Sequence, residues 1–241
     1  MEEYYETNLF SKPFISAIIV AAGSSTRMGG EDKQMIELLG IPVLARTMLA
    51  FEHCEDISEI IVVTKKQSFA AVYGFAEKYG ITKFVKAVEG GESRSESVRN
   101  GVYAISEKAD FVAIQDGARP LVTPKEISRC AEDAVRCGGA VLAVPVTDTI
   151  KYGRKNGFVE YTPAREKLFA AQTPQIFSAE IYKAAMERAF KELGNWTDDS
   201  RIFENDGRKV FITEGSRTNI KITSPEDVMI AEAILKGREL K

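Results

Sequence analysis

The sequence has one histidine, three cysteines and no excess of positive charge. Hydrolysis by a Ser-His-Asp or Cys-His arrangement would have to rest on His53 alone, and so would a histidine-rich zinc site. His53 adjoins Cys54 near the end of a predicted helix, where a structural role is favoured. The sequence therefore argues against all of these chemistries.

Cysteine usage and charge restrict the cellular setting. Cys54, Cys130 and Cys137 form an odd set without a CxxC or a metal-ligand spacing, which favours reduced thiols, no disulfides and a cytoplasmic location. A net charge of -3 gives no general field for nucleic acid or anionic lipid. No run approaches the roughly 20 apolar residues of a membrane helix, and residues 1–13 are acidic and aromatic, unlike a secretory signal. We expect no nucleic-acid or membrane partner.

Apolar strand signals alternate with helical spacing along the first 146 residues. Strands are predicted at 16–22, 57–64, 81–88, 110–115 and 140–146, and helices at 43–52, 68–79, 92–108 and 124–137. Thr123 is a predicted N-cap before Pro124. The alternation predicts a doubly wound, mostly parallel α/β sheet covered on both faces. We expect a flexible leader at 1–13 and one domain at 14–241, with further helices at 179–193 and 225–235 and short strands at 209–213 and 218–222.

The pattern changes after Val146. Residues 149–152 and 158–161 are rich in β-formers and flank an Asn156-Gly157 turn signal, which predicts a projecting hairpin arm at about 147–163. An isolated hairpin is marginally stable in water, so a second copy of the chain is its expected partner. The alternative is a hairpin folded back on its own domain.

Three segments are predicted to meet at the carboxyl edge of the sheet, where ligands bind in such folds. Gly23 and the hydroxyl residues after it can expose backbone N–H groups to a phosphate, with Arg27 and Lys33 adding charge; this is not a Walker A loop, and an ordinary turn is the alternative. Asp116 ends a strand and can hold a magnesium ion beside a triphosphate, or cap a turn or pair with Arg119. Gly90-Gly91 opens a helix and can bind a base or sugar edge, or serve as capping.

These residues belong to an ordered set of motifs: A-A-G-S-S-T-R-M, K-Q, G-G-x-x-R-x-x-S-V, D-G-A-R-P, D-T-I-K, Q-T-P-Q-x-F, T-D-D and N-I-K-I-T-x-P-E-D. The set spans about residues 16–235 and resembles the 2-C-methyl-D-erythritol 4-phosphate cytidylyltransferase family. The resemblance implies a Rossmann-like nucleotidyltransferase fold and a magnesium-dependent homodimer. It also implies transfer of a cytidylyl group from CTP to methylerythritol phosphate, with release of pyrophosphate, in the non-mevalonate route to isoprenoid precursors.

The resemblance also implies roles for individual positions. Contacts to CTP are expected from Ala21, Ala22, Gly23, Ser25, Gly91, Glu92 and Ser97. Arg27 and Lys33 would stabilise the reacting phosphates, and Asp116 would hold Mg²⁺. Arg165, from the partner subunit, and Lys221 would position methylerythritol phosphate, with Arg119, Thr173 and Thr197 nearby.

The chain departs from the family pattern at two of these positions. Arg165 stands in Pro163-Ala164-Arg165, where family members have Val-Asp-Arg, and Glu31-Asp32 precedes Lys33, where they commonly have Pro. An acidic neighbour there would weaken the field at the triphosphate.

Two other functions would require different residues. A ribitol 5-phosphate cytidylyltransferase tends to show Ala-Gly-Gly and Ser-Val-Arg-Pro, where this chain has Ala-Ala-Gly and Gly-Ala-Arg-Pro. A non-catalytic nucleotide-binding module should have lost Lys33, Asp116 or Lys221, and all three are present.

Overall fold

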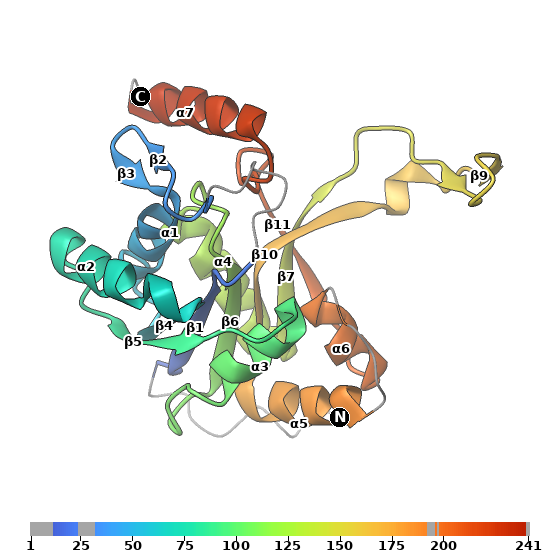
Figure 1. The fold of residues 1–241 in the computed structure, drawn as a ribbon. Coiled ribbons are helices and arrows are strands. Elements are labelled where there is room, and N and C mark those ends of the chain that lie inside the picture. Colours follow the sequence, from blue (N-terminus) through green and yellow to red (C-terminus); the bar gives the residue numbers. More distant parts are fainter. Residues whose placement is uncertain (1–11, 24–31, 192–195, 197, 240–241) are drawn as a thin grey trace.

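A seven-stranded sheet forms the centre of the computed structural model, which describes residues 12–23, 32–191, 196 and 198–239 (Figure 1). The strand order is β11-β7-β10-β6-β1-β4-β5. The strands are β1 (Ile15–Val20), β4 (Glu59–Thr64), β5 (Phe84–Glu89), β6 (Phe111–Asp116), β7 (Gly139–Pro145), β10 (Phe169–Ser178) and β11 (Phe211–Glu214). Only β10 runs antiparallel to its neighbours in this sheet. The predicted mostly parallel sheet is confirmed.

Helices cover both faces of the sheet, because buried strands are apolar on both sides. In β1, Ile15, Ala17 and Ile19 pack into one core cluster, and Ile18 and Val20 pack into another. The first cluster is covered by α1 (Val43–Glu52), α2 (Phe69–Tyr79) and α4 (Pro124–Cys137), and the second by α3 (Arg94–Val102), α5 (Ala179–Lys191) and α6 (Asp199–Asn205). The doubly wound arrangement is therefore confirmed.

A third, smaller core lies beyond the sheet, where α7 (Pro225–Glu239) packs near the hairpin of β2 (Glu37–Leu38) and β3 (Ile41–Pro42) (Figure 1). Leu38, Ile222 and Ala231 are fully buried in it. The segment that joins this core to the sheet carries Lys221.

Capping boxes begin two of the helices. The Thr123 hydroxyl accepts the N–H of Glu126, whose carboxylate accepts the N–H of Thr123, and Pro124 occupies the first turn of α4 as predicted. Ser93 and Glu96 form the same arrangement at α3, so that helix begins at Arg94. Capping of this kind fixes where a helix starts and which side chains its first turn presents.

Several elements differ from the prediction: the sequence analysis predicted neither α6 nor the β2–β3 hairpin, and β5 begins at Phe84 and not at residue 81. Helix α3 ends at Val102, well before residue 108, because Ala104 N–H bonds the Gly101 carbonyl and Ser106 N–H bonds the Glu59 carboxylate. Strand β10 was not predicted, since its centre is polar. The strand predicted at 218–222 is wrong: Asn219 closes a turn on Ser216.

The predicted arm projects from the sheet as a separate hairpin of β8 (Tyr152–Gly153) and β9 (Val159–Tyr161) (Figure 1). The turn contains Gly157 with φ of +88°, a region that favours glycine. The Tyr152 and Tyr161 rings stack with centroids 4.8 Å apart, yet Phe158 remains 72% exposed. The hairpin does not fold back on its own domain.

The remaining expectations concern the cysteines, membrane spans and the N-terminal segment. The three cysteines are free thiols. Among the described residues, no helix has the length and apolarity needed to cross a membrane. Residues 1–11 of the expected leader lie outside the described residues, and Lys12 pairs with Asp56 at 3.1 Å.

Candidate functional site

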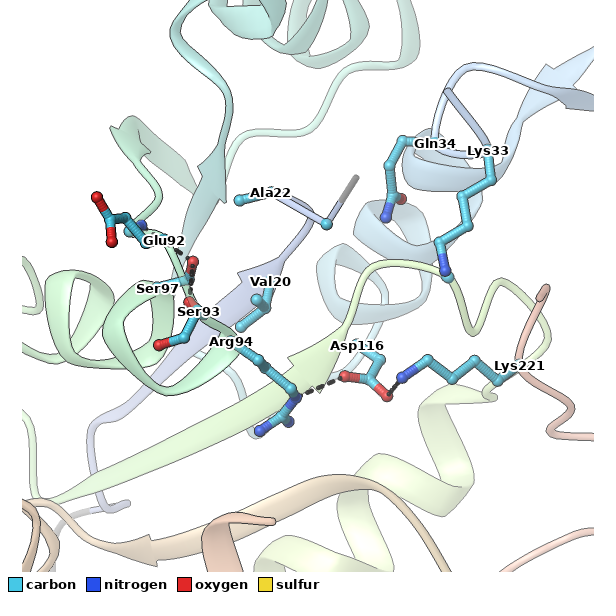
Figure 2. A pocket seen from close by; sticks show the side chains of 13 residues that line it. Val20, Ala22, Lys33, Gln34, Glu92, Ser93, Arg94, Ser97, Asp116 and Lys221 are labelled. Atoms are coloured by element: carbon cyan, nitrogen blue, oxygen red, sulfur yellow. Dashed lines mark hydrogen bonds and ion pairs between the residues drawn. The ribbon is translucent and has the colours of Figure 1, made fainter. Parts of the chain in front are cut away.

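A cavity of about 340 Å³ opens at the carboxyl ends of β1 and β6, the edge where the three sequence signals were predicted to meet. It has the size of a small-molecule site. Its lining comprises Val20, Ala22, Gly23, Lys33, Gln34, Gly91, Glu92, Ser93, Arg94, Ser97, Asp116, Ala118 and Lys221. Figure 2 shows Glu92, Ser93 and Ser97 on one side, Lys33 and Lys221 on the other, and Arg94 and Asp116 between them.

The first wall is a tightly packed turn ahead of α3. The Gly91 N–H donates to Ser97 Oγ at 3.1 Å, and that hydroxyl donates to the Ser93 carbonyl at 2.9 Å. A Cβ on Gly90 would lie 2.3 Å from the Ala22 Cβ. The backbones of two loops thus approach each other more closely than side chains allow.

Lys221 lies on the opposite wall in an irregular segment that crosses above the strand ends. The Ile222 N–H donates to the Ala118 carbonyl at 2.8 Å. The Asn219 side chain, fully buried, donates to the Thr173 carbonyl at 3.0 Å. These bonds hold the backbone on both sides of Lys221, so its position is set by the fold.

The Asp116 carboxylate lies at the centre of three cations. Its Oδ1 is 3.3 Å from Arg94 Nε, and its Oδ2 is 2.7 Å from Lys221 Nζ and 3.8 Å from Arg119 Nε. Burial alone would raise the pKa of Asp116, but the three cations outweigh it and hold that pKa well below its usual range. The carboxylate is therefore ionised, and the predicted alternative of a pair with Arg119 occurs together with the pairs to Arg94 and Lys221.

Arg94 continues this cluster into the protein. Its Nη2 lies 2.8 Å from Asp199 Oδ2, and Asp199 Oδ1 accepts the Tyr182 hydroxyl at 3.0 Å. Sequence reasoning assigned Arg94 no role. The available signal was its place as the arginine of G-G-x-x-R, directly after the capping serine of a helix.

The structure brings most of the predicted site residues together. Those that line the cavity are Ala22, Gly23, Lys33, Gly91, Glu92, Ser97, Asp116 and Lys221. Arg119 and Thr173 contact Asp116, the latter by accepting its backbone N–H at 3.1 Å. Ser25, Arg27, Glu31 and Thr197 lie outside the described residues.

Among the described residues, two other predicted site residues, Ala21 and Arg165, neither line the cavity nor bond to Asp116. Ala21 is buried in the core, with its N–H bonded to the Val63 carbonyl at 2.7 Å. Arg165 is exposed on the short helix η3 (Arg165–Lys167) and donates to the Thr147 carbonyl at 2.8 Å, near the root of the arm.

The cavity's chemistry suits a divalent cation that arrives with phosphates. Within the described part of the chain, no group of three His, Cys, Asp or Glu side chains could hold a metal ion. Magnesium, however, is commonly held by one or two carboxylates together with phosphate oxygens and water. The ionised Asp116 carboxylate has about four lone-pair positions, of which Arg94 and Lys221 take two. The residues fit such an ion.

Comparison with known proteins agrees with this geometry. The family model described as 2-C-methyl-D-erythritol 4-phosphate cytidylyltransferase matches residues 15–237. Proteins of that name from Dehalococcoides mccartyi and Halalkalibacterium halodurans are 41% and 43% identical to the chain, over 95% and 93% of it and 99% and 98% of their own lengths.

Solved structures give the same result. The 4-diphosphocytidyl-2C-methyl-D-erythritol synthase from Anaerococcus prevotii superposes with a TM-score of 0.84 at 31% identity, over 93% of this chain and 97% of its own. The 2-C-methyl-D-erythritol 4-phosphate cytidylyltransferase from Francisella tularensis superposes with a TM-score of 0.76 at 29% identity, over 91% and 99%. All four names specify methylerythritol, whereas ribitol appears in none of them.

Proposed function

The chain belongs to the 2-C-methyl-D-erythritol 4-phosphate cytidylyltransferase family, and we propose that its cavity transfers a cytidylyl group from CTP to 2-C-methyl-D-erythritol 4-phosphate. The products are CDP-methylerythritol and pyrophosphate. The observation that carries the proposal is the cavity itself, which sets two lysines opposite a glycine-rich turn at the carboxyl edge of the sheet. The reaction belongs to the synthesis of isoprenoid precursors.

The proposed chemistry needs cations and not a base. A phosphate monoester has a second pKa of about 6 and is mostly dianionic at neutral pH. One of its oxygens attacks the α-phosphorus of CTP, the new P–O bond forms, and the bond to the β-phosphate breaks with its electron pair leaving on pyrophosphate. The barrier lies in bringing two anions together and in stabilising the charge that develops on the α-phosphate.

The two walls of the cavity bind different substrates. The Gly91 turn holds the nucleotide together with Ala22, Gly23, Glu92 and Ser97, which line the cavity. Ala21 and Ser25, which flank Ala22 and Gly23 in the sequence, are assigned to the same contact. Lys33 lies across the cavity and, with Arg27, stabilises the phosphates. Lys221 holds the methylerythritol phosphate, and Arg119, Thr173 and Thr197 are assigned to the same substrate; of these three, Arg119 and Thr173 contact Asp116.

Asp116, together with phosphate oxygens of the triphosphate, would hold a magnesium ion. When bound, it neutralises phosphate charge and favours departure of pyrophosphate. Asp116 also holds the Lys221 ammonium at 2.7 Å, so one carboxylate would serve both the metal and the cation that positions the acceptor.

The arm supports a homodimer. Its aromatic and β-branched side chains are exposed, with Phe158 at 72%, Val159 at 58% and Tyr161 at 52%, and such a surface favours a protein partner. Arg165 lies near the root of this arm and outside its own subunit's cavity, which supports a role in the site of the partner subunit. The three free thiols support a cytoplasmic location.

The test of the reaction is pyrophosphate release from CTP with a panel of acceptors: methylerythritol phosphate, ribitol 5-phosphate and glycerol 3-phosphate. We expect turnover with the first, little with the others, and none in excess chelator. Comparable rates with ribitol 5-phosphate would contradict the acceptor assignment, and full activity with chelator would contradict the metal.

The shared site is tested by mixing inactive subunits. Arg165→Ala and Lys33→Ala subunits are combined, and subunit exchange is verified by mass spectrometry of differently tagged chains. A heterodimer has one site with both wild-type residues, so part of the activity should return. Verified heterodimers as inactive as either parent would assign Arg165 to its own subunit or to no site.

A further inference from the structure

Arg94 joins two carboxylates from different parts of the fold. Asp116 ends β6 at the cavity, and Asp199 begins α6 on the face of the sheet covered by α3, α5 and α6. The Arg94 guanidinium reaches both, through Nε to the first at 3.3 Å and Nη2 to the second at 2.8 Å. A planar guanidinium holds two partners in fixed directions, which the single ammonium of lysine does not.

The inner end of this connection is anchored in the core. The Asp199 side chain is 2% exposed, and it accepts the hydroxyl of Tyr182 at 3.0 Å. The Tyr182 ring is fully buried and stacks on Phe177 with centroids 5.0 Å apart. A carboxylate with so little freedom gives Arg94 a fixed position, because moving it would expose or unpair buried polar groups.

The contact between Arg94 and Asp116 determines the orientation of the Asp116 carboxylate. Figure 2 shows Arg94 and Lys221 on opposite sides of this carboxylate, with Arg94 bonded to Oδ1 and Lys221 to Oδ2. If Arg94 released Oδ1, the carboxylate could rotate and draw the Lys221 ammonium toward both oxygens. The ammonium would then be displaced from the cavity, and a displacement of about 1 Å can cost about 10²-fold in rate.

We propose that Arg94, anchored by Asp199 and Tyr182, is a positioning residue for the transfer reaction: it fixes the direction in which Asp116 holds the Lys221 ammonium. The inference rests on the proposed function, in which Lys221 binds the acceptor phosphate. It assigns the effect of Arg94 to the acceptor side of the reaction and not to the binding of CTP.

The first variant is Arg94→Met. We expect kcat/KM for methylerythritol phosphate to fall on the order of 10²-fold and the Kd for CTP to change by less than about threefold. Arg94→Lys should restore only a small part, since an ammonium cannot hold both carboxylates. A matched control is Arg99→Met on the same helix, where the guanidinium lies over the Phe190 ring at 4.3 Å and away from the cavity lining; its kinetics should be unchanged.

A double variant distinguishes the proposed positioning role of Arg94 from a role in stability alone. Arg94→Met leaves Asp199 as an unpaired buried carboxylate, which destabilises a protein, whereas removing both charges is often tolerated. Arg94→Met/Asp199→Asn should therefore recover thermal stability while kcat/KM for the acceptor stays low. Recovery of both would overturn the inference, as would a rise in the Kd for CTP that accounts for the whole loss.

Asp199→Asn alone covers the case in which neither Arg94 variant folds. It keeps an acceptor for Tyr182 but loosens Arg94, so kcat/KM for the acceptor should fall about tenfold, and an unchanged value would overturn the inference. If the wild-type protein shows no turnover, the proposed function fails and this inference with it. Wild-type turnover together with full activity of the double variant overturns the inference alone.

Discussion

Gly90→Ala is expected to damage CTP binding through a steric conflict that the backbone cannot easily relieve. The new Cβ would lie 2.3 Å from the Ala22 Cβ and 3.0 Å from Ser97 Oγ, whereas ordinary contact begins at 3.4 Å. Gly90 N–H is bonded to the Thr64 carbonyl at 3.0 Å, and Ala21 N–H to the Val63 carbonyl at 2.7 Å. Both loops are thus tied to β4, and no flexible side chain can move aside at Ala22.

The conflict requires the two loops to separate by about an ångström, which costs on the order of 10²-fold when it displaces a reacting group. Overpacking of this kind also costs about 1–3 kcal/mol of stability. We therefore expect kcat/KM for CTP to fall about 10- to 100-fold, with a lower unfolding temperature. Initial rates against CTP, calorimetric titration with CTP and thermal unfolding measure the three quantities.

Gly74→Ala is the matched control, because a Cβ on this exposed glycine of α2 meets nothing within 4 Å. Replacing a helical glycine by alanine stabilises by about 0.5–1 kcal/mol, and CTP kinetics should be unchanged. A Gly90→Ala protein with wild-type CTP kinetics would refute the reasoning, because it would show that the close approach of the two loops does not shape the nucleotide site.

Three further outcomes are expected. Lys33→Ala and Arg27→Ala should each lower kcat on the order of 10²-fold with little change in unfolding temperature, because the proposed function assigns both cations to the charge that develops on the phosphates. A variant with normal kcat would show that its residue does not have this role. Burial raises the pKa of Cys130 to about 12, so mass spectrometry should show the partly exposed Cys137 reacting with a thiol reagent at pH 8 while Cys130 remains unmodified in the native protein. The pKa of Asp116 is lower in the folded protein than its unfolded value of about 3.9, so the ionised carboxylate stabilises the fold above that pH and this stabilisation is lost on acidification. The difference in unfolding free energy between wild type and Asp116→Asn should therefore shrink from pH 5 to pH 2. A constant difference would contradict the ion pairs.

The sequence predicts those parts of the fold in which one physical signal dominates. Strand β6 and helix α4 were predicted to within one residue, because the first is a continuous apolar run and the second has a cap and an N-terminal proline. Strand β10 was missed because its centre, with Gln172 and Gln175 buried, satisfies its polar groups by tertiary hydrogen bonds that no local pattern reveals. The strand predicted at 218–222 is wrong because its apolar signal has another cause: Ile222 is buried against α7 and not in a strand.

The sequence likewise predicts some residues of the site and misses others. Asp116 and Lys33 were placed at the carboxyl edge because strand order and loop position bring them there. Arg94 was assigned no role because its importance depends on Asp199, which is 105 positions away in the chain. Ion pairs between distant segments are a consequence of the tertiary fold.

In the proposed reaction, the Asp116 carboxylate would keep several cations in place in the cavity before any phosphate binds. Arg94 and Arg119 carry like charges that repel, and burial together with the charge of Arg94 lowers the pKa of Arg119. Without a carboxylate between them, such cations would repel one another and turn toward solvent. Asp116 holds them within 4 Å of itself, while the cations still outnumber the carboxylates of the cluster. If the cavity binds phosphates as proposed, this acidic residue should strengthen anion binding, because cations that are already in place need no rearrangement when charge develops.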